Sequence, residues 1–115
     1  MHAPVELTQW RELPPDDTVA AAVEALRMLA DPTRLRMLWL LCGDEYDVTT
    51  LAAAVGIARP AVSQHLAKLR IAGLVATRRD GRRAVYRATG GHVKRMLGEA
   101  VAAAHHRVSN VPDGD

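Results

Sequence analysis

A change of hydrophobic period at Gly73 constrains this chain more than any other feature of its sequence. Before the glycine, PAVSQHLAKLRI repeats Val62, Leu66 and Leu69 at steps of four and three, which places them on one face of a helix over residues 60–71. After it, LVATRRDGRRAVYRA alternates as two short runs joined at an Asp-Gly pair, and tight hairpin turns favour that pair. A helix followed directly by a basic β-hairpin is therefore predicted.

A second short helix comes just before this one. The run LAAAVG follows Thr49 and Thr50, either of which suits its N-cap, and Gly56 suits its C-terminal end. The turn IARP then leads into the helix over 60–71. Two short helices joined by a turn and followed by a hairpin predict a winged helix-turn-helix, a fold that binds DNA.

Two longer helices are expected upstream of this unit. The Asp31-Pro32 pair ends one helix near residue 30 and begins another over 32–41, which Gly43 closes. Candidate N-cap oxygens for the first helix come from Asp16, Asp17 and Thr18. The first helix is expected to place Val19, Val23, Leu26 and Leu29 or Ala30 on one face, and the second to bury Leu35, Leu38, Trp39 and Leu41.

Length and composition predict a single, mainly α domain with a small β-hairpin. The 115 residues suffice for a modest core, and the 49% hydrophobic content comes chiefly from Ala, Leu and Val, with only 3% aromatic residues. Residues 1–15 contain three prolines and no sustained period, so an extended N-terminal arm is expected there. The domain then covers 16–107, and 108–115 form a flexible C-terminal tail. Added stability from a partner subunit is expected at this size.

Charge is distributed unevenly along the chain. The net charge is +2, but residues 1–58 hold four arginines and nine acids, giving −5, whereas residues 59–115 hold eleven basic and four acidic residues, giving +7. A basic half indicates an anionic partner at one face, because phosphate contacts depend on local charge. A merely solvated basic surface is the alternative.

The candidate DNA-binding residues come from two predicted elements. One is the helix over residues 60–71, the recognition helix, and the other is the basic hairpin that follows it, the wing. Ser63 and Gln64 lie near the start of the helix, where side chains reach base edges in the major groove. His65 is either a base contact or a surface histidine beside the DNA backbone. Arg59 and Lys68 are expected to contact phosphates. The wing arginines are expected to contact phosphates or to enter the minor groove, and they are Arg78, Arg79, Arg82 and Arg83.

Several other classes of protein are disfavoured. No run approaches the roughly 18 apolar residues of a membrane span, and the N-terminus lacks the layout of a signal peptide, so a soluble, cytoplasmic protein with no membrane partner is expected. The single cysteine, Cys42, cannot form an internal disulfide and is expected to be a buried core thiol. No glycine-rich phosphate loop, H-E-x-x-H or G-x-S-x-G motif indicates an enzyme. A pure protein-interaction module stays open, and it predicts no salt-sensitive DNA binding.

Three segments together resemble the ArsR/SmtB metalloregulators in order and spacing, over roughly residues 19–106. They are RMLADPTRLRMLWLL, LAAAVGIARPAVSQHLAKLRIAGLV and RRDGRRAVYR. The resemblance implies protomers of order α-α-α-α-β-β-α that form a homodimer through the first and last helices. It also implies binding to a pseudo-palindromic operator, usually to repress transcription until a metal ion lowers DNA affinity.

The last predicted helix, GGHVKRMLGEAVAAAHHRV, contains His92, His105 and His106. The fourteen residues from His92 to His106 amount to nearly four helical turns, so both histidines share a face but lie roughly 21 Å apart along the axis. One protomer cannot bring them to one ion. If two copies of the helix pack antiparallel about a two-fold axis, His92 of one copy meets His106 of the other, and two equivalent sites form.

The resemblance also shows where this chain departs from the usual ligand set. Many members begin the last helix with Asp-x-His and add two histidines about eleven and fourteen residues further on. Gly90 and Ala103 replace two of these four positions here, so a four-ligand zinc site is doubtful. The chain is more similar to actinobacterial nickel- and cobalt-sensing members, in which a ligand pair follows the first histidine by thirteen and fourteen residues, as His105 and His106 do. The implied effector is therefore Ni²⁺ or Co²⁺, with Zn²⁺ as a third candidate.

Nickel and cobalt accept more than four nitrogen or oxygen ligands, so further donors are needed. The candidates are Glu99, Asp113, Asp115, His2 and the terminal amine. Residues 44–51 contain no thiol, which disfavours a site for arsenic or a soft metal. Solvated histidines that complement the helix dipole are the alternative to a metal site. In that case the chain is a regulator with weak or no metal sensing, acting as an activator or with an accessory protein as its sensor.

Overall fold

A computed structural model describes residues 10–109, and within them five helices and three short strands form. The order of elements agrees with the prediction except for one additional strand. The helices are α1 Asp16–Leu29, α2 Pro32–Gly43, α3 Val48–Val55, α4 Arg59–Ile71 and α5 Gly90–Val108. The strands are β1 Tyr46–Asp47, β2 Val75–Asp80 and β3 Arg83–Ala88.

Carboxylates cap two of the helices. Asp31 accepts a hydrogen bond of 2.9 Å from the backbone N–H of Arg34 and so caps α2, as predicted, with proline at the first helical position. Asp47 caps α3 by accepting from the backbone N–H of Thr50 at 2.7 Å. The expectation that a threonine caps α3 was therefore wrong, because the helix begins at Val48, two or three residues earlier than a cap at Thr49 or Thr50 requires.

The core lies where α2, α3 and α4 meet and is closed by the start of α5. Met37, Leu38, Leu51 and Leu69 are fully buried, and Leu97 of α5 is almost so. The predicted buried face of α4 is confirmed, since Val62, Leu66 and Leu69 all belong to this cluster. The packing leaves the opposite side of α4 in solvent.

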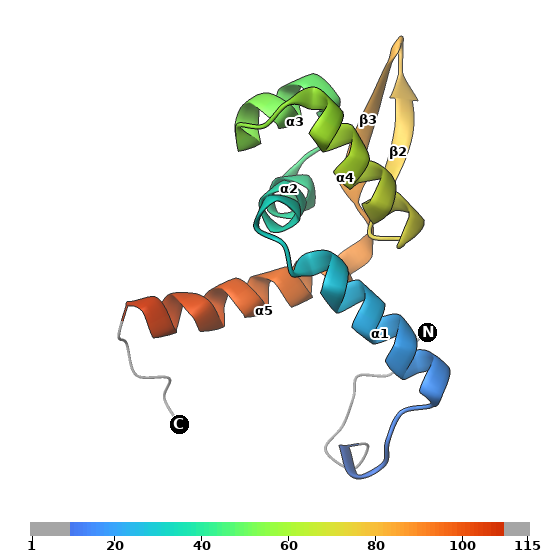
Figure 1. Cartoon of the computed structure of the whole chain (residues 1–115), viewed down its shortest axis with the longest axis vertical. Coiled ribbons are helices and arrows are strands. Elements are labelled where there is room, and N and C mark those ends of the chain that lie inside the picture. The colour runs from blue at the N-terminus through green and yellow to red at the C-terminus, as the bar shows by residue number, and fades with distance from the viewer. Residues whose placement is uncertain (1–9, 110–115) are drawn as a thin grey trace.

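The apolar face of helix α1 is largely exposed in the protomer. Only Leu29 of its apolar face is buried, whereas Leu26 is 56% exposed and Val19 and Val23 are also exposed. The helix touches the body at its C-terminal end alone and extends away from it (Figure 1). Its N-cap is Pro15, with no side-chain hydrogen bond, in place of the carboxylates or threonine predicted. An apolar helix face is thus left without a partner inside the protomer.

Helix α2 also differs from prediction on one side. Leu38 and Leu41 are buried as expected, but Trp39 is 46% exposed and Leu35 is only half-buried. The run MLWLLC is apolar all round, so its period could not show which side faces the core. The side that carries Trp39 forms part of two surface hollows beside α5.

The strands form an antiparallel sheet in the order β1-β3-β2. The predicted hairpin is confirmed, but β1 adds a third strand beside β3, pairing Tyr46 with Tyr86 and Asp47 with Val85. The last pair of the hairpin joins Asp80 to Arg83, so its two loop residues are Gly81 and Arg82 and not the Asp-Gly pair. Gly81 has φ +66°, a conformation that favours glycine.

The register assigns each wing side chain to a face, because residues directly opposite in neighbouring strands share one. Tyr46 and Tyr86 lie on the inner face and pack against the core. Arg78, Val85 and Asp47 form one lateral row on the outer face. Of the two adjacent arginines of β2, the first therefore points away from the core and the second, Arg79, lies on the inner side.

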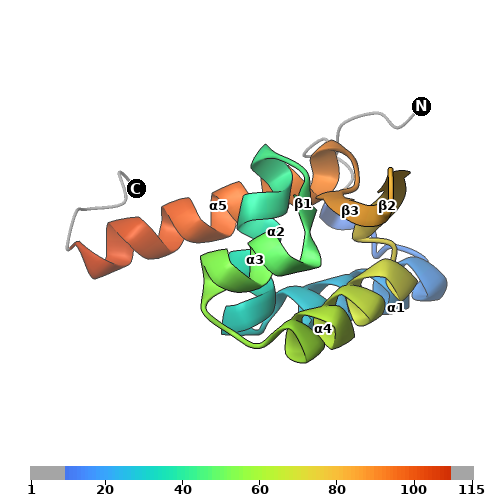
Figure 2. The ribbon, with the colours of Figure 1, turned by 90° about the horizontal axis from the view of Figure 1, so that it is seen from above.

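The predicted DNA-binding elements and the helices expected to form the dimer interface lie at opposite ends of the protomer. Helices α3 and α4 and the hairpin occupy one end, while α1 and α5 extend from the other (Figure 1). Seen from above, α5 extends sideways past α2 and α3 (Figure 2). Within residues 10–109 no helix is both long and apolar enough to span a bilayer. Most of the predicted N-terminal arm, and the tail from residue 110 onward, lie outside the described residues.

Candidate nucleic-acid interface

Helix α4 presents a polar surface opposite its buried leucines. Arg59, Ser63, Gln64 and Lys68 are all exposed, as the helical period predicts. No carboxylate lies in α4, so nothing on the helix itself repels a phosphate. The N-terminal half of this surface carries the short polar side chains of Ser63 and Gln64, and side chains of this kind form hydrogen bonds with base edges in a major groove.

His65 is placed differently from its neighbours on α4. The residue is half-buried, and its Nδ1 is buried with no hydrogen-bond partner among the described residues. The pKa of Asp31, the N-cap of α2, is lowered chiefly by its hydrogen bond from the N–H of Arg34. Because Nδ1 is covered by the protein, a base contact from His65 would have to come from Nε2.

Two of the four wing arginines are engaged in ion pairs. Arg78 donates from Nε and Nη2 to the two carboxylate oxygens of Glu45, each at 2.7 Å. Arg83 donates to Asp47 at 2.8 Å and to Asp80 at 3.2 Å. The expectation that all four arginines contact DNA took no account of these carboxylates.

The pKa shifts at these pairs agree with the geometry. The hydrogen bonds from Arg78 lower the pKa of Glu45. The pKa of Asp47 is lowered first by the N–H and hydroxyl of Thr50 and then by Arg83. The same carboxylates raise the pKa of both arginines. Both pairs are thus fully ionised at neutral pH.

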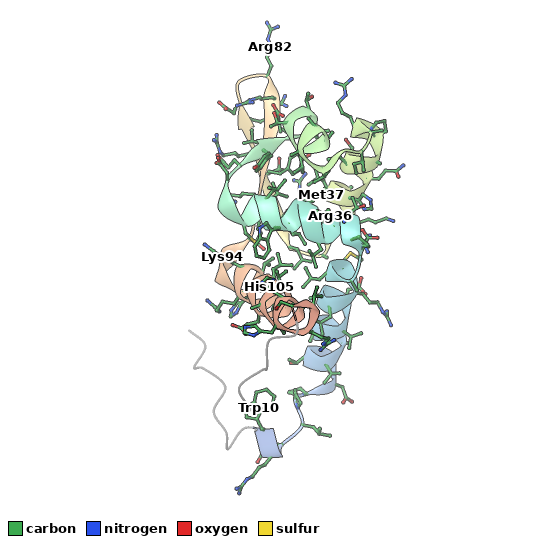
Figure 3. All side chains as sticks on the ribbon, turned by 90° about the vertical axis from the view of Figure 1, so that its left-hand side faces the viewer. Trp10, Arg36, Met37, Arg82, Lys94 and His105 are labelled. Atoms are coloured by element: carbon green, nitrogen blue, oxygen red, sulfur yellow. The ribbon has the colours of Figure 1, made fainter. Side chains whose placement is uncertain are left out.

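The other two arginines make no ion pair with any residue between 10 and 109. Arg82 occupies the hairpin loop and points away from the body at the tip of the wing (Figure 3). Arg79 is exposed and lies on the inner face of the sheet, the side toward α4. Of the wing arginines, these two have guanidinium groups free to meet an anion.

Helix α5 carries the three candidate metal ligands on exposed positions. His92 lies in its first turn, and His105 and His106 lie in its last turns, which extend beyond the body (Figures 1 and 3). Arg95 donates a hydrogen bond of 3.0 Å to Nδ1 of His92. Between residues 10 and 109, no three His, Cys, Asp or Glu side chains come together to hold a metal ion. A single protomer does not bring these histidines to one site, as their spacing predicts.

Of the remaining ligand candidates, the structure describes only Glu99. Glu99 is exposed on α5, and His2, Asp113, Asp115 and the terminal amine lie outside the described residues. Cys42 packs against the core but is only partly buried, beside a hollow of about 330 Å³ that Trp39 and Lys94 also line. Burial raises the pKa of its thiol, which disfavours the thiolate form that binds metals.

Comparison with known proteins connects this geometry to a family. The pattern described as "Bacterial regulatory protein, arsR family" matches residues 31–77, which contain the helix-turn-helix. The sequence is 50% identical over 98 residues to the HTH-type transcriptional regulator KmtR of Mycobacterium tuberculosis, covering 85% of this chain and 75% of that relative. The chain belongs to the ArsR family. As a member it is a DNA-binding transcriptional regulator and not an enzyme.

Solved structures of two other proteins share the fold. The antimony-specific transcriptional repressor AntR superimposes with a TM-score of 0.79 at 30% identity, covering 94% of this chain and 99% of that one. The homodimeric winged helix-turn-helix domain of Mb0332 from Mycobacterium bovis gives a TM-score of 0.73 at 30% identity, covering 83% and 91%. The winged helix-turn-helix predicted from the sequence is thus confirmed for this ArsR-family chain.

Sequence reasoning missed the two carboxylates that pair with the wing of this ArsR-family regulator. The sequence contained part of the information needed to find them. With a two-residue loop, the hairpin register alone puts Arg78, Asp80 and Arg83 on one face and Arg79 on the other. The acidic run DEYD just before α3 supplies Glu45 and Asp47, but only the pairing of β1 with β3 shows that these acids reach that face.

Proposed function

We propose that this ArsR-family regulator binds operator DNA as a homodimer and that a metal ion, Ni²⁺ or Co²⁺, lowers its affinity for that DNA. The observation that carries the DNA half is the division of α4 into a buried apolar side and an exposed side bearing Ser63 and Gln64. These two residues read base edges, while Arg59 and Lys68 contact phosphates. Arg79 and Arg82 of the wing supply further phosphate or minor-groove contacts.

The exposed apolar surface supports a dimer. Val19, Val23 and Leu26 leave a helix face of α1 without a partner in the protomer, and the last turns of α5 extend into solvent. A second copy that packs on α1 and α5 covers both surfaces. The homodimeric relative from Mycobacterium bovis has the same fold. A two-fold axis through these helices places two copies of α4 for the two halves of a pseudo-palindromic operator.

The metal half of the proposal rests on the histidines of α5. Imidazole nitrogens suit nickel, cobalt and zinc, and all three side chains are accessible to an ion. Antiparallel packing of two α5 helices joins His92 of one protomer to His106 of its partner, with His105 adjacent. The 50% identity to KmtR favours a shared type of effector. The ion would link the two protomers, and its coupling to DNA binding is reciprocal by thermodynamic linkage.

The test is a DNA-binding titration with and without metal. Fluorescence anisotropy of the full chain on the DNA upstream of its own gene, at several salt concentrations, measures affinity and the number of phosphate contacts. We expect salt-sensitive binding that Ni²⁺ or Co²⁺ weakens by at least about tenfold, with no weakening in His92→Ala. Absence of salt-sensitive binding contradicts the DNA half. Binding that no metal changes contradicts the sensor half and indicates a regulator whose sensor is another protein.

A further inference from the structure

The outer face of the wing carries an arrangement that the proposed function does not use. Glu45 and Asp47, beside and within β1, reach across the sheet to arginines of β2 and β3. Val85 of the central strand lies between Arg78 and Asp47 in register. It is only 4% exposed, although it does not belong to the core cluster. The ion pairs and the arginine stems therefore cover a small apolar site on the outside of the hairpin.

One carboxylate joins this face to the helix-turn-helix. Oδ1 of Asp47 accepts the N–H of Thr50 and so caps α3, while Oδ2 accepts from Arg83 of β3 at 2.8 Å. The side chain of Asp47 is only 18% exposed. The first helix of the DNA-binding unit and the wing are thus fastened to the same residue.

The wing needs such support. A two-stranded hairpin is marginally stable by itself, and β1 contributes only two residues to the sheet. Near the tip, beyond Asp47 and Val85, β1 no longer pairs with β3. Asp47, the last residue of β1, pairs with Arg83 beyond that point, and Glu45, just before β1, forms a doubly hydrogen-bonded pair with Arg78 of the outer strand.

We infer that Glu45 and Asp47 are positioning residues for DNA binding: they hold the wing at a fixed angle to α4 through Arg78 and Arg83, and they leave Arg79 and Arg82 for the DNA. This inference rests on the proposed function. It reverses the expectation from charge alone, in which two carboxylates close to the DNA-binding surface repel phosphates and their removal strengthens binding.

Asp44 provides a matched control that distinguishes positioning of the wing from charge repulsion of phosphates. It is exposed and adjacent to Glu45, and its Oδ1 accepts the N–H of Glu45 at 2.7 Å, but it forms no ion pair with residues 10–109. Asp44→Asn removes the same charge from almost the same place. Asparagine retains a side-chain oxygen that can accept the backbone N–H, both here and in Asp47→Asn, so the cap of α3 is also kept.

The experiment measures operator affinity against salt for Glu45→Gln with Asp47→Asn, and for Asp44→Asn. We expect the double variant to bind about fivefold more weakly, since two exposed pairs are lost, and its salt slope to fall by up to about two as Arg79 and Arg82 lose their contacts. Asp44→Asn should bind as tightly as the wild type or slightly more tightly. Equal strengthening in all the variants contradicts the positioning role and leaves only charge repulsion.

Arg78, which forms the ion pair with Glu45, gives a second comparison. Arg78→Gln should weaken DNA binding to the same degree as Glu45→Gln. The variant that combines these two substitutions should bind no more weakly than either one, because each of the three variants removes the same Glu45–Arg78 ion pair. A much larger loss for Arg78→Gln alone shows that Arg78 contacts DNA directly and overturns the inference.

Hydrogen exchange of the DNA-free protein separates this inference from the proposed function. The amides of β2 and β3 should exchange several-fold faster in the double variant, with the amides of α5 unchanged as an internal control. If the wild type binds no operator DNA, the proposed function fails, yet this measurement still decides whether the carboxylates hold the wing. Unchanged exchange in the hairpin contradicts the inference.

Discussion

The guanidinium of Arg95 donates a hydrogen bond from Nη2 to Nδ1 of His92 over 3.0 Å. A guanidinium has no acceptor, so Nδ1 carries the lone pair and the ring proton is on Nε2. A metal ion that binds Nδ1 must displace Arg95. An ion that binds Nε2 requires the proton to move to Nδ1, where it meets the donor of Arg95. In either case the arginine competes with a metal ion at the proposed site.

Replacing Arg95 with alanine should therefore strengthen metal binding. We expect about a three- to tenfold gain in affinity for Ni²⁺, since one hydrogen bond and one like charge beside the ion are lost. Isothermal titration calorimetry of the dimer measures this. Arg82→Ala, at the tip of the wing, removes the same charge far from α5 and should leave the affinity unchanged. Weaker nickel binding in Arg95→Ala contradicts the competition described.

Gln64 and Lys68 should differ in how their loss affects DNA recognition. If Gln64 reads a base, Gln64→Ala costs about 1–3 kcal/mol on the operator and little on unrelated DNA of the same length. Lys68→Ala weakens binding to both DNAs equally and lowers the salt slope by about one unit. Competition titrations with the two DNAs at several salt concentrations distinguish the effects. A uniform loss in Gln64→Ala assigns that residue to the backbone.

The helices and the hairpin were predictable because their signals are local. The recognition helix starts within one residue of its prediction, and α5 has the predicted bounds, since glycines, prolines and the apolar period mark these ends. Strand β1 was not predicted. Two residues cannot show a period, and its partner in β3 lies some forty residues further along the chain.

The candidate site was predictable only in part, for the same reason. The period of α4 identified which side chains face outward, and the structure agrees for Ser63 and Gln64. It did not show that Nδ1 of His65 is buried, because that burial depends on tertiary packing. The pairing of Arg78 with Glu45 likewise depends on tertiary structure. The metal ligands depend on a second protomer, which no periodicity within one chain describes.

Acid should destabilise this protein through its capping and paired carboxylates. The folded state lowers the pKa of Asp31 and Asp47 from 3.8 and that of Glu45 from 4.5. A lowered pKa means that the stabilisation is present above the unfolded value and is lost as the pH falls through the folded value. The urea midpoint should therefore be nearly flat above about pH 5 and fall steadily below pH 4.

Asp31→Asn isolates one of these contributions. Asparagine still caps α2, so stability at pH 7 should change little, but the decline below pH 4 should become shallower. Asp16→Asn is the control, because this carboxylate of α1 forms no hydrogen bond within residues 10–109. An identical acid profile for Asp31→Asn and the wild type contradicts the role of the cap.

Leu38 and Trp39 are neighbours on α2 with opposite surroundings, which allows a direct test of how the helix is oriented. Leu38 is fully buried and Trp39 is 46% exposed. Leu38→Ala should lower the free energy of unfolding by about 2–5 kcal/mol, through lost burial and the cavity that remains. Trp39→Ala should cost about 1 kcal/mol despite the larger side chain, since half of it lies in solvent.

Unfolding of a dimer depends on protein concentration, so both variants must be compared with the wild type at one concentration and in the same denaturant. Analytical ultracentrifugation of each variant shows whether the exposed indole also contributes to the contact between protomers. If Trp39→Ala costs as much as Leu38→Ala while the dimer remains intact, α2 is rotated so that its tryptophan faces the core.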